Sequence, residues 1–203
     1  MDDIDAIARM ARSVLRGGAS GLRAEGAESI RAFREITALP IVGMVKARDA
    51  EGEVYITPTF ADAQAVAAAG ADIIALDCTQ RRLTEAEPWP ELVRRIHVEL
   101  DRPVLADIAS MDDALAAQAA GADAVATTLY GYTSETAGIR EISWPLLQAL
   151  VEDLSIPVIA EGHLQQPEEV RRALDLGAHA ALVGSAITRP ETITARFVAA
   201  TRR

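Results

Sequence analysis

Charged side chains follow several of the apolar segments of this chain, at the points where those segments end. Lys46, Glu161 and Asp107 each occupy such a position, and Arg23 lies near the end of an earlier segment. At the end of a buried strand, a lysine becomes a usable base or Schiff-base nucleophile because partial burial lowers its pKa. A carboxyl group there suits general acid–base work, its pKa raised by burial or held down by a nearby lysine. A surface lysine and a structural salt-bridge partner are the simpler interpretations of Lys46 and Glu161.

Small residues near the C-terminus form a candidate anion site. Gly184 and Ser185 follow the last apolar segment and precede a predicted helix, and Arg189 lies just before that helix. Backbone N–H groups can converge on an anion where side chains are small, and a helix N-terminus favours negative charge. Arg189 could add a charge-assisted clamp, and Gly162 follows the preceding apolar segment. The spacing predicts a phosphate site.

The remaining polar candidates are less specific. Asp77 ends an apolar segment and could orient a substrate or serve a structural ion pair, whereas Thr128 follows another segment. His163 is the one histidine expected near these positions. The acids lack the spacing of a calcium loop, and no Cys/His cluster has zinc spacing. The sequence therefore predicts no metal site.

Glycine and proline punctuate the chain at intervals of about one strand plus one helix. In chain order these residues are Gly18, Pro40, Gly70, Pro103, Gly121, Pro157 and Gly177. Each is followed by an apolar run, and the runs end near residues 24, 45, 76, 106, 126, 160 and 183. Seven successive βα units predict an α/β fold of the parallel (β/α)8 TIM-barrel type, whose chemistry lies at the carboxyl ends of the strands.

A helix precedes the first predicted strand. Ile4, Ile7, Ala11 and Leu15 recur at helical spacing. Seven further helices are predicted, near residues 27–38, 60–69, 89–100, 111–120, 144–153, 167–176 and 190–201. Seven strands instead of eight indicate a barrel that is open or lacks its first β-strand in this chain. Residues 46–58 and 127–143 form longer connections at the catalytic mouth.

Composition narrows the class of protein. The 203 residues carry a net charge of −10, which argues against nucleic acid or an anionic membrane as a partner. A single cysteine, Cys78, permits no internal disulfide and fits a reducing cytoplasm. No apolar stretch is long enough for a transmembrane helix, and the acidic start is unlike a signal peptide. One soluble domain over residues 1–203 is expected.

Several segments resemble the N-acetylmannosamine-6-phosphate 2-epimerase family. The resemblance is colinear along the chain and most specific in residues 127–133 and in the segment Gly-Ser-Ala-Ile-Thr-Arg at 184–189. Residues 21–26, 41–46, 71–77 and 158–162 also carry it. The family resemblance implies interconversion of N-acetylmannosamine 6-phosphate and N-acetylglucosamine 6-phosphate in sialic acid breakdown.

Site roles follow from the matching motifs. The resemblance implies that Lys46 and Glu161 transfer protons and that Arg23, Asp107 and Thr128 bind the sugar. It assigns the phosphate to Gly162, Gly184, Ser185 and Arg189. It also implies a homodimer that needs no metal or organic cofactor.

The resemblance also predicts a difference at the front of the chain. Members of the family have a strand before the first helix, so the domain is expected to be N-terminally truncated relative to them. Three alternatives stay open: a Schiff-base aldolase that uses Lys46, a non-catalytic phosphosugar-binding barrel, and a remnant without function. A purely structural barrel is disfavoured because it would not need a polar residue at every strand end.

Overall fold

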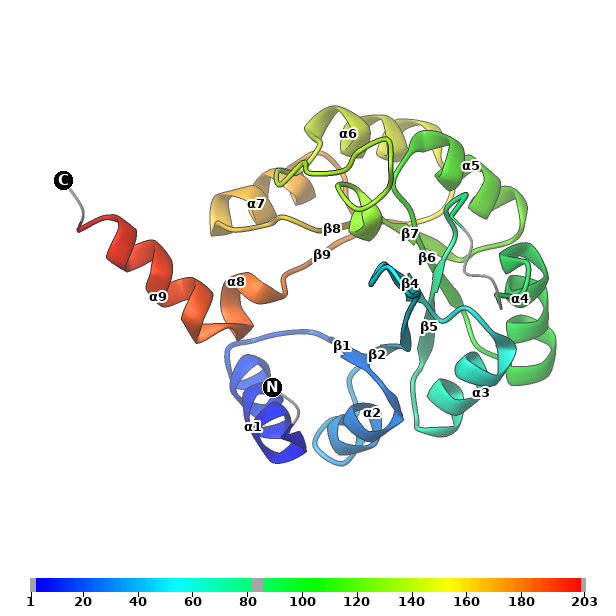
Figure 1. Cartoon of the computed structure of the whole chain (residues 1–203), viewed down its shortest axis with the longest axis horizontal. Coiled ribbons are helices and arrows are strands. Elements are labelled where there is room, and N and C mark those ends of the chain that lie inside the picture. Colours follow the sequence, from blue (N-terminus) through cyan, green and yellow to red (C-terminus); the bar gives the residue numbers. More distant parts are fainter. Residues whose placement is uncertain (1–2, 82–85, 202–203) are drawn as a thin grey trace.

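Seven parallel strands form one curled sheet, with helices along its outer side (Figure 1). The computed structural model describes residues 3–81 and 86–201. The sheet order is β1-β2-β5-β6-β7-β8-β9, so each strand of the curled sheet pairs with the next one along the chain. The strands are β1 (Leu22–Glu25), β2 (Ile41–Met44), β5 (Ile73–Asp77), β6 (Val104–Asp107), β7 (Ala124–Ala126), β8 (Val158–Glu161) and β9 (Ala180–Leu182). Each ends within about one residue of its predicted end, which confirms the α/β barrel prediction.

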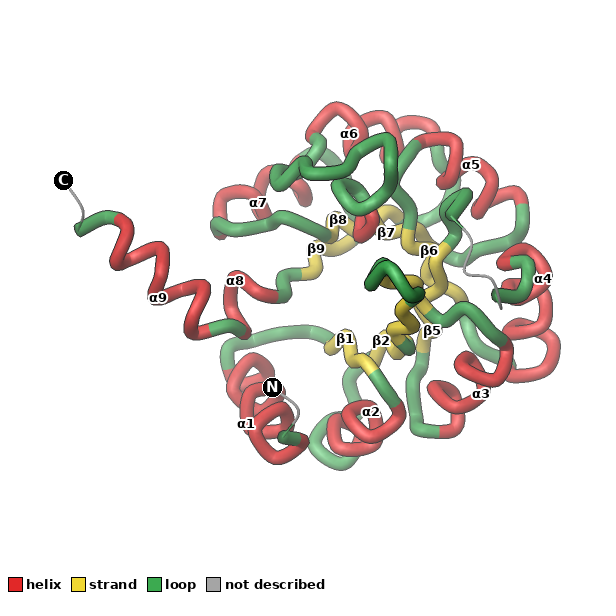
Figure 2. The backbone as a smooth tube through the Cα atoms, in the orientation of Figure 1, coloured by secondary structure: helices red, strands yellow, loops and turns green. Residues whose placement is uncertain are grey.

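The barrel is open between β1 and β9. These two strands are the edges of the sheet within the described part of the chain, and Figure 2 shows the strands curling around the interior from one to the other. The seven predicted strands are all present, and the sheet that they form is open, which is one of the two possibilities left by the strand count.

Helices follow the strands in the predicted order. They are α1 (Ile4–Arg16), α2 (Ala27–Arg34), α3 (Phe60–Ala68), α4 (Trp89–Arg95), α5 (Met111–Ala119), α6 (Trp144–Asp153), α7 (Pro167–Asp175), α8 (Ser185–Thr188) and α9 (Pro190–Ala199). Thr59 and Ser110 cap α3 and α5, because each hydroxyl accepts a hydrogen bond from an N–H in the first turn.

Three helices differ from the prediction. Helix α2 ends at Arg34, four residues early, and the guanidinium of Arg34 then donates to the carbonyls of Thr37, Leu39 and Gly70. Helix α4 continues as a π-helical turn, Ile96–Leu100, which ends at Asp101 with φ 51°. The four-residue helix α8 was not predicted. It lies between β9 and α9, where the sequence analysis placed a loop.

The connection predicted at residues 46–58 contains an antiparallel hairpin. Strand β3 (Lys46–Arg48) pairs with β4 (Val54–Ile56) through Lys46↔Ile56, Ala47↔Tyr55 and Arg48↔Val54. Lys46 therefore begins β3, two residues after β2 ends, and its side chain is exposed. This placement differs from the expected lysine at the rim of the sheet, because the chain leaves the parallel sheet at Val45 and turns into the hairpin.

Two apolar clusters fill the space around the sheet. The larger one lies between the strands and the surrounding helices and includes Ile30, Val66, Ile74, Leu92 and Leu147. The smaller one consists of Met44, Ile56, Ala75, Leu105 and Ala126, which lie on the strands and the hairpin. Ile56 thus anchors the hairpin to the interior of the barrel.

Candidate active site

Four of the residues predicted for the site meet at the carboxyl ends of the strands. Arg23 is on β1, Asp107 ends β6, Thr128 lies in the short 3-10 turn after β7, and Glu161 ends β8. Parallel strands in register place their last residues at the same edge of the sheet, and the curl turns these side chains toward one another. The sequence analysis listed these positions separately, and the structure brings them together.

Arg23 is the centre of the cluster. Its Nη1 and Nη2 atoms donate to Oδ1 and Oδ2 of Asp107 at 3.0 and 2.5 Å, a two-pronged pair. Nη1 also donates to Oε2 of Glu161 at 2.6 Å and to Oγ1 of Thr128 at 3.4 Å. The Thr128 hydroxyl in turn donates to Asp107 at 2.5 Å. One guanidinium therefore connects β1 with the ends of β6 and β8 and with the turn after β7.

The cluster is almost completely buried. The side chains of Arg23, Asp107 and Glu161 are 5%, 0% and 11% exposed. Burial alone would lower the pKa of Arg23, but the Asp107 and Glu161 carboxylates outweigh burial and raise it. Arg23 is therefore a fixed cation. Its Nε atom is buried without a hydrogen-bond partner among the described residues, so it is available to an incoming acceptor.

The pKa of Glu161 is raised well above the ordinary value for glutamate. Burial raises its pKa to about 7, and the negative charge of Asp107 adds to that shift, whereas the charge of Arg23 opposes it. A carboxyl group with this pKa changes protonation state near neutral pH. It can therefore accept or release a proton under ordinary conditions.

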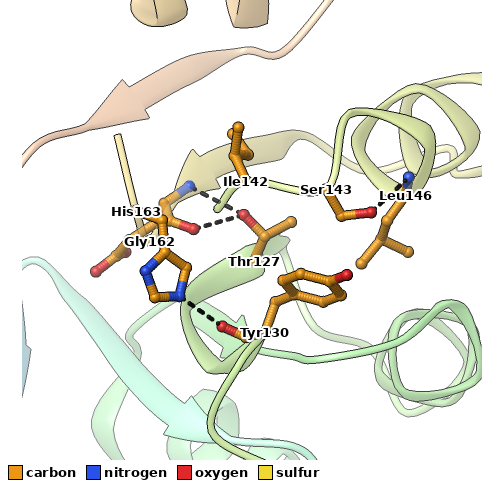
Figure 3. Close-up of a pocket in the computed structure, with 8 residues that line it drawn as sticks. Thr127, Tyr130, Ile142, Ser143, Leu146, Gly162 and His163 are labelled. Atoms are coloured by element: carbon orange, nitrogen blue, oxygen red, sulfur yellow. Dashed lines mark hydrogen bonds between the residues drawn. The ribbon is translucent and has the colours of Figure 1, made fainter. Parts of the chain in front are cut away.

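Thr127 fixes the backbone of Glu161. Its hydroxyl donates to the Glu161 carbonyl at 2.7 Å and accepts from the Glu161 N–H at 3.0 Å. Figure 3 shows both bonds beside a small pocket. The sequence analysis singled out Thr128 and gave no role to Thr127. Its adjacency to Thr128 was the only available signal, since the partner lies 34 residues further along the chain.

The pocket beside Glu161 lies between the loop after β7 and the start of α6. Its lining residues are Thr127, Tyr130, Ile142, Ser143, Leu146, Glu161, Gly162 and His163. His163 lies at its edge with φ 58°, and its Nε2 is 3.1 Å from the Tyr130 carbonyl oxygen (Figure 3). The Tyr132 ring stacks on the His163 ring with 5.7 Å between the centroids. His163 thus lines the pocket and is held there by Tyr130 and Tyr132.

The predicted phosphate residues follow two neighbouring strands. Glu161 pairs in register with Leu182, so Gly162 and Gly184 come shortly after a matched pair of positions on β8 and β9. Gly162 has φ 92°, a conformation that side chains disfavour. Gly184, Ser185 and Arg189 are exposed around the short helix α8.

Asp77 takes a different partner from the central cluster. It ends β5, accepts hydrogen bonds from the N–H and hydroxyl of Thr79 at 3.0 and 2.7 Å, and pairs with Arg81 at 2.8 Å. Burial raises its pKa, while the Thr79 hydrogen bond and the Arg81 charge oppose that shift. Of the two roles considered for Asp77, the structure shows the ion pair, and its partner Arg81 is separate from the Arg23 cluster.

Metal clusters and membrane-spanning helices are both absent from the described residues. Within residues 3–81 and 86–201, no group of three or more His, Cys, Asp or Glu side chains could hold a metal ion. None of the described helices has the length and apolar character required to cross a membrane. Independence from metals and cofactors stays a prediction.

The fold and the site define a barrel enzyme with an acid–base cluster at the carboxyl ends of its strands. The family described as "Putative N-acetylmannosamine-6-phosphate epimerase" matches residues 7–203. The chain belongs to this family, as the motifs at residues 127–133 and 184–189 predicted. The predicted enzyme class, a carbohydrate epimerase, is confirmed with it.

Curated relatives and a solved structure agree with this assignment. A protein of Thermosynechococcus vestitus is 49% identical over 194 residues, covering 96% of this chain and 84% of that protein. A protein of Clostridioides difficile is 42% identical, with 95% and 86% covered. Both carry the description "Putative N-acetylmannosamine-6-phosphate 2-epimerase". The solved N-acetylmannosamine-6-phosphate 2-epimerase of Clostridium perfringens superposes with a TM-score of 0.92 at 39% identity, covering 98% of this chain and 86% of that one.

Proposed function

We propose that this chain interconverts N-acetylmannosamine 6-phosphate and N-acetylglucosamine 6-phosphate by moving a proton at C2 of the sugar. The observation that carries the proposal is the carboxyl group of Glu161, which is 11% exposed and lies 2.6 Å from the guanidinium of Arg23. Burial raises the pKa of this carboxyl group to about 7. It lies in a cluster at the mouth of a barrel whose family is named for this substrate.

The chemistry of C2 explains why such a group is needed. The two sugars differ only in configuration at C2, so a C–H bond must break and re-form on the other face. In the open-chain aldehyde that hydrogen is α to the C1 carbonyl, and a base can remove it to leave an enolate. The proton must then arrive from the opposite face, which requires a second acid–base group.

Lys46 and Glu161 are the two groups that we assign to the two faces. Glu161 projects from the end of β8, and Lys46 begins the hairpin that follows β2. Figure 1 shows this hairpin over the interior of the curled sheet. The exposed ammonium group of Lys46 can turn toward a sugar bound at the mouth, and its positive charge would stabilise the enolate oxygen.

Arg23, Asp107 and Thr128 would bind the sugar. Their hydrogen bonds hold one another in place, so the site is already organised before substrate arrives. The Nε atom of Arg23 offers a buried donor for a sugar oxygen. The net charge of the chain is −10, and Arg23 places a fixed positive charge within the mouth.

Gly162, Gly184, Ser185 and Arg189 would bind the 6-phosphate. The two glycines follow adjacent strands and add no side chains that would obstruct an anion. The Ser185 hydroxyl and the Arg189 guanidinium are exposed and can donate hydrogen bonds to phosphate oxygens.

The wider setting is part of the same proposal. We assign the enzyme to sialic acid and amino-sugar catabolism in the cytoplasm, acting as a homodimer without metal or organic cofactor. The single cysteine supports a reducing compartment, and the acidic charge disfavours nucleic acid and anionic membranes. The exposed apolar side chains of Ile187, Phe197 and Val198 on α8 and α9 support self-association.

Proton NMR in heavy water tests the reaction. With N-acetylglucosamine 6-phosphate as substrate, we expect the manno epimer to form with deuterium at C2. Lys46→Ala and Glu161→Ala should each reduce turnover to background while the thermal unfolding curve is retained. Near-normal turnover in either variant would contradict its role, and borohydride trapping of substrate on Lys46 would instead indicate a Schiff-base aldolase.

A further inference from the structure

The hairpin that carries Lys46 is too small to hold its own position. Strands β3 and β4 have three residues each and pair only with one another. An isolated two-stranded hairpin is marginally stable in water. Contacts outside the hairpin must therefore determine where Lys46 lies.

Thr57 holds the base of the hairpin. Its N–H donates to the Val45 carbonyl at 2.8 Å, and its hydroxyl accepts from the Val45 N–H at 3.2 Å. Thr57 is completely buried and has φ 47°, which is costly for a β-branched residue. These bonds fix the residue directly before Lys46, and Val54 and Ile56 of β4 pack on the smaller apolar cluster. Neither contact involves Glu53 or Tyr55 in the outer part of the hairpin.

Arg81 contacts that outer part. Its guanidinium carbon lies 5.1 Å from the centre of the Tyr55 ring on β4, and Nη1 is 3.6 Å from the carboxylate of Glu53. Tyr55 pairs in register with Ala47, the residue after Lys46. The Arg81 side chain is 15% exposed, whereas that of Glu53 is 61% exposed, so the contact with the Tyr55 ring contributes more than the ion pair.

The same guanidinium is anchored to the barrel. Nη2 of Arg81 donates to Asp77 Oδ2 at 2.8 Å at the end of β5, and Nε donates to Thr79 Oγ1 at 3.4 Å. Nη1 also donates to the carbonyl of Tyr132 at 3.4 Å, in the long connection after β7. Arg81 thus joins the hairpin to the rigid sheet and to the other long loop of the mouth.

We propose that Arg81 is a positioning residue that holds the β3–β4 hairpin so that Lys46 reaches one face of the substrate. The proposal rests on the acid–base role of Lys46 proposed above. A shift of about 1 Å in a reacting group can cost about 100-fold in rate. Loss of Arg81 should therefore affect proton transfer by Lys46 more than substrate binding.

Exchange of the C2 hydrogen separates the two faces. In heavy water, Lys46→Ala keeps Glu161, so only the epimer whose C2–H faces Glu161 should still exchange. Glu161→Gln should leave exchange in the opposite epimer. We expect Arg81→Ala to lower kcat for epimerisation about 10- to 100-fold with KM changed less than about threefold. Its residual exchange should be in the same epimer as for Lys46→Ala.

Control variants distinguish positioning from general damage. Arg94→Ala removes an exposed ion pair with Glu91 on α4. It should leave the rate of epimerisation and the rate of C2 exchange unchanged. Arg81→Lys keeps the charge without the planar fork and should recover part of kcat. If Arg81→Ala does not fold, Tyr55→Leu removes the ring under the guanidinium and should reproduce the same bias in exchange.

Two results would overturn the proposal. One is epimerisation at the wild-type rate in Arg81→Ala or, if that variant does not fold, in Tyr55→Leu. The other is an equal loss of exchange in both epimers, which indicates a structural role only. A wild-type chain that neither epimerises nor exchanges would overturn the proposed function, and this inference with it.

Discussion

Charge balance within the central cluster determines which side chain can change protonation. Arg23 is one buried cation facing two carboxylates, Asp107 and Glu161. Asp107 accepts hydrogen bonds from both Nη atoms of the guanidinium and from the Thr128 hydroxyl. Glu161 accepts one hydrogen bond from Arg23 and lies near the negative charge of Asp107. The cluster therefore concentrates its titration on Glu161.

The titration of Glu161 can be measured directly in the substrate-free protein. Carbon-13 NMR of labelled glutamate carboxyl groups should show one midpoint at about 7, assigned by its loss in Glu161→Gln. If the signal lost in Glu161→Gln instead has its midpoint near 4.5, the ordinary value for glutamate, the burial argument is contradicted.

The rate should follow the same titration. A two-face mechanism needs one proton shared between Glu161 and Lys46, so that one group is an acid and the other a base. Below about pH 7 Glu161 becomes protonated and can no longer act as the base. We expect kcat/KM to fall on the acid side of about pH 7 in both directions, because the ratio of the two values equals a fixed equilibrium constant. A flat profile between pH 5 and 8 would exclude this assignment.

Strand β2 packs closely against helices α2 and α3 at Gly43. Gly43 lies between strand residues that precede the hairpin, and its missing side chain lets α2 and α3 approach. A Cβ atom at Gly43 would lie 2.5 Å from Val66 Cγ1 and 2.7 Å from Ala71 Cβ. These neighbours are buried, so they have little room to move.

Substitution at Gly43 should therefore weaken the fold. We expect Gly43→Ala to lower the free energy of unfolding by about 1–3 kcal/mol, the usual cost of overpacking a core. Ala61→Ser, on the exposed side of α3, should change it by less than about 0.5 kcal/mol. Urea unfolding of the three proteins checks this, and an unaltered midpoint for Gly43→Ala would show that the core can relax.

Elements with a strong local signal were predictable from the sequence. Buried parallel strands such as β5 and β6 are continuous apolar runs, and Gly or Pro marks where each begins. The ends of these runs located Asp107 and Glu161 correctly. The hairpin was missed because its strands are short and alternate with charges, as in Lys46–Arg48.

Tertiary partners explain the remaining differences. Thr127 supports Glu161 and Arg81 supports the hairpin through contacts with residues distant in sequence, which no local pattern marks. The exposure of Lys46 has the same origin, since the hairpin carries it away from the sheet. The local pattern indicated a base or a Schiff-base nucleophile at Lys46, and the family resemblance implied proton transfer, which stays a prediction.

The cluster that forms the site also joins strands that lie far apart in the sheet. Strands β1 and β8 are separated by four strands within the sheet, yet Arg23 and Glu161 are in contact across the interior. The ion cluster therefore connects a strand at the open edge of the barrel with the opposite wall.

Helix α9 is the part of the molecule with the least support from the rest. It extends away from the barrel in Figure 1, and none of its residues is buried. Phe197 is 71% exposed, and Val198 and Ile187 are also exposed. Apolar groups of this size on one projecting segment favour association with another copy of the chain.

Sedimentation of the wild-type chain and of Phe197→Glu tests that association. We expect a wild-type dimer. Burying one phenylalanine contributes about 1.5–3 kcal/mol, and a twofold dimer contains two copies, so Phe197→Glu should weaken the dimer by about 100-fold or more. Val98→Glu is the matched control, because Val98 is 72% exposed on the π-helical turn after α4. A dimer unaffected by Phe197→Glu would place the interface elsewhere, and dissociation by Val98→Glu would move it to that turn.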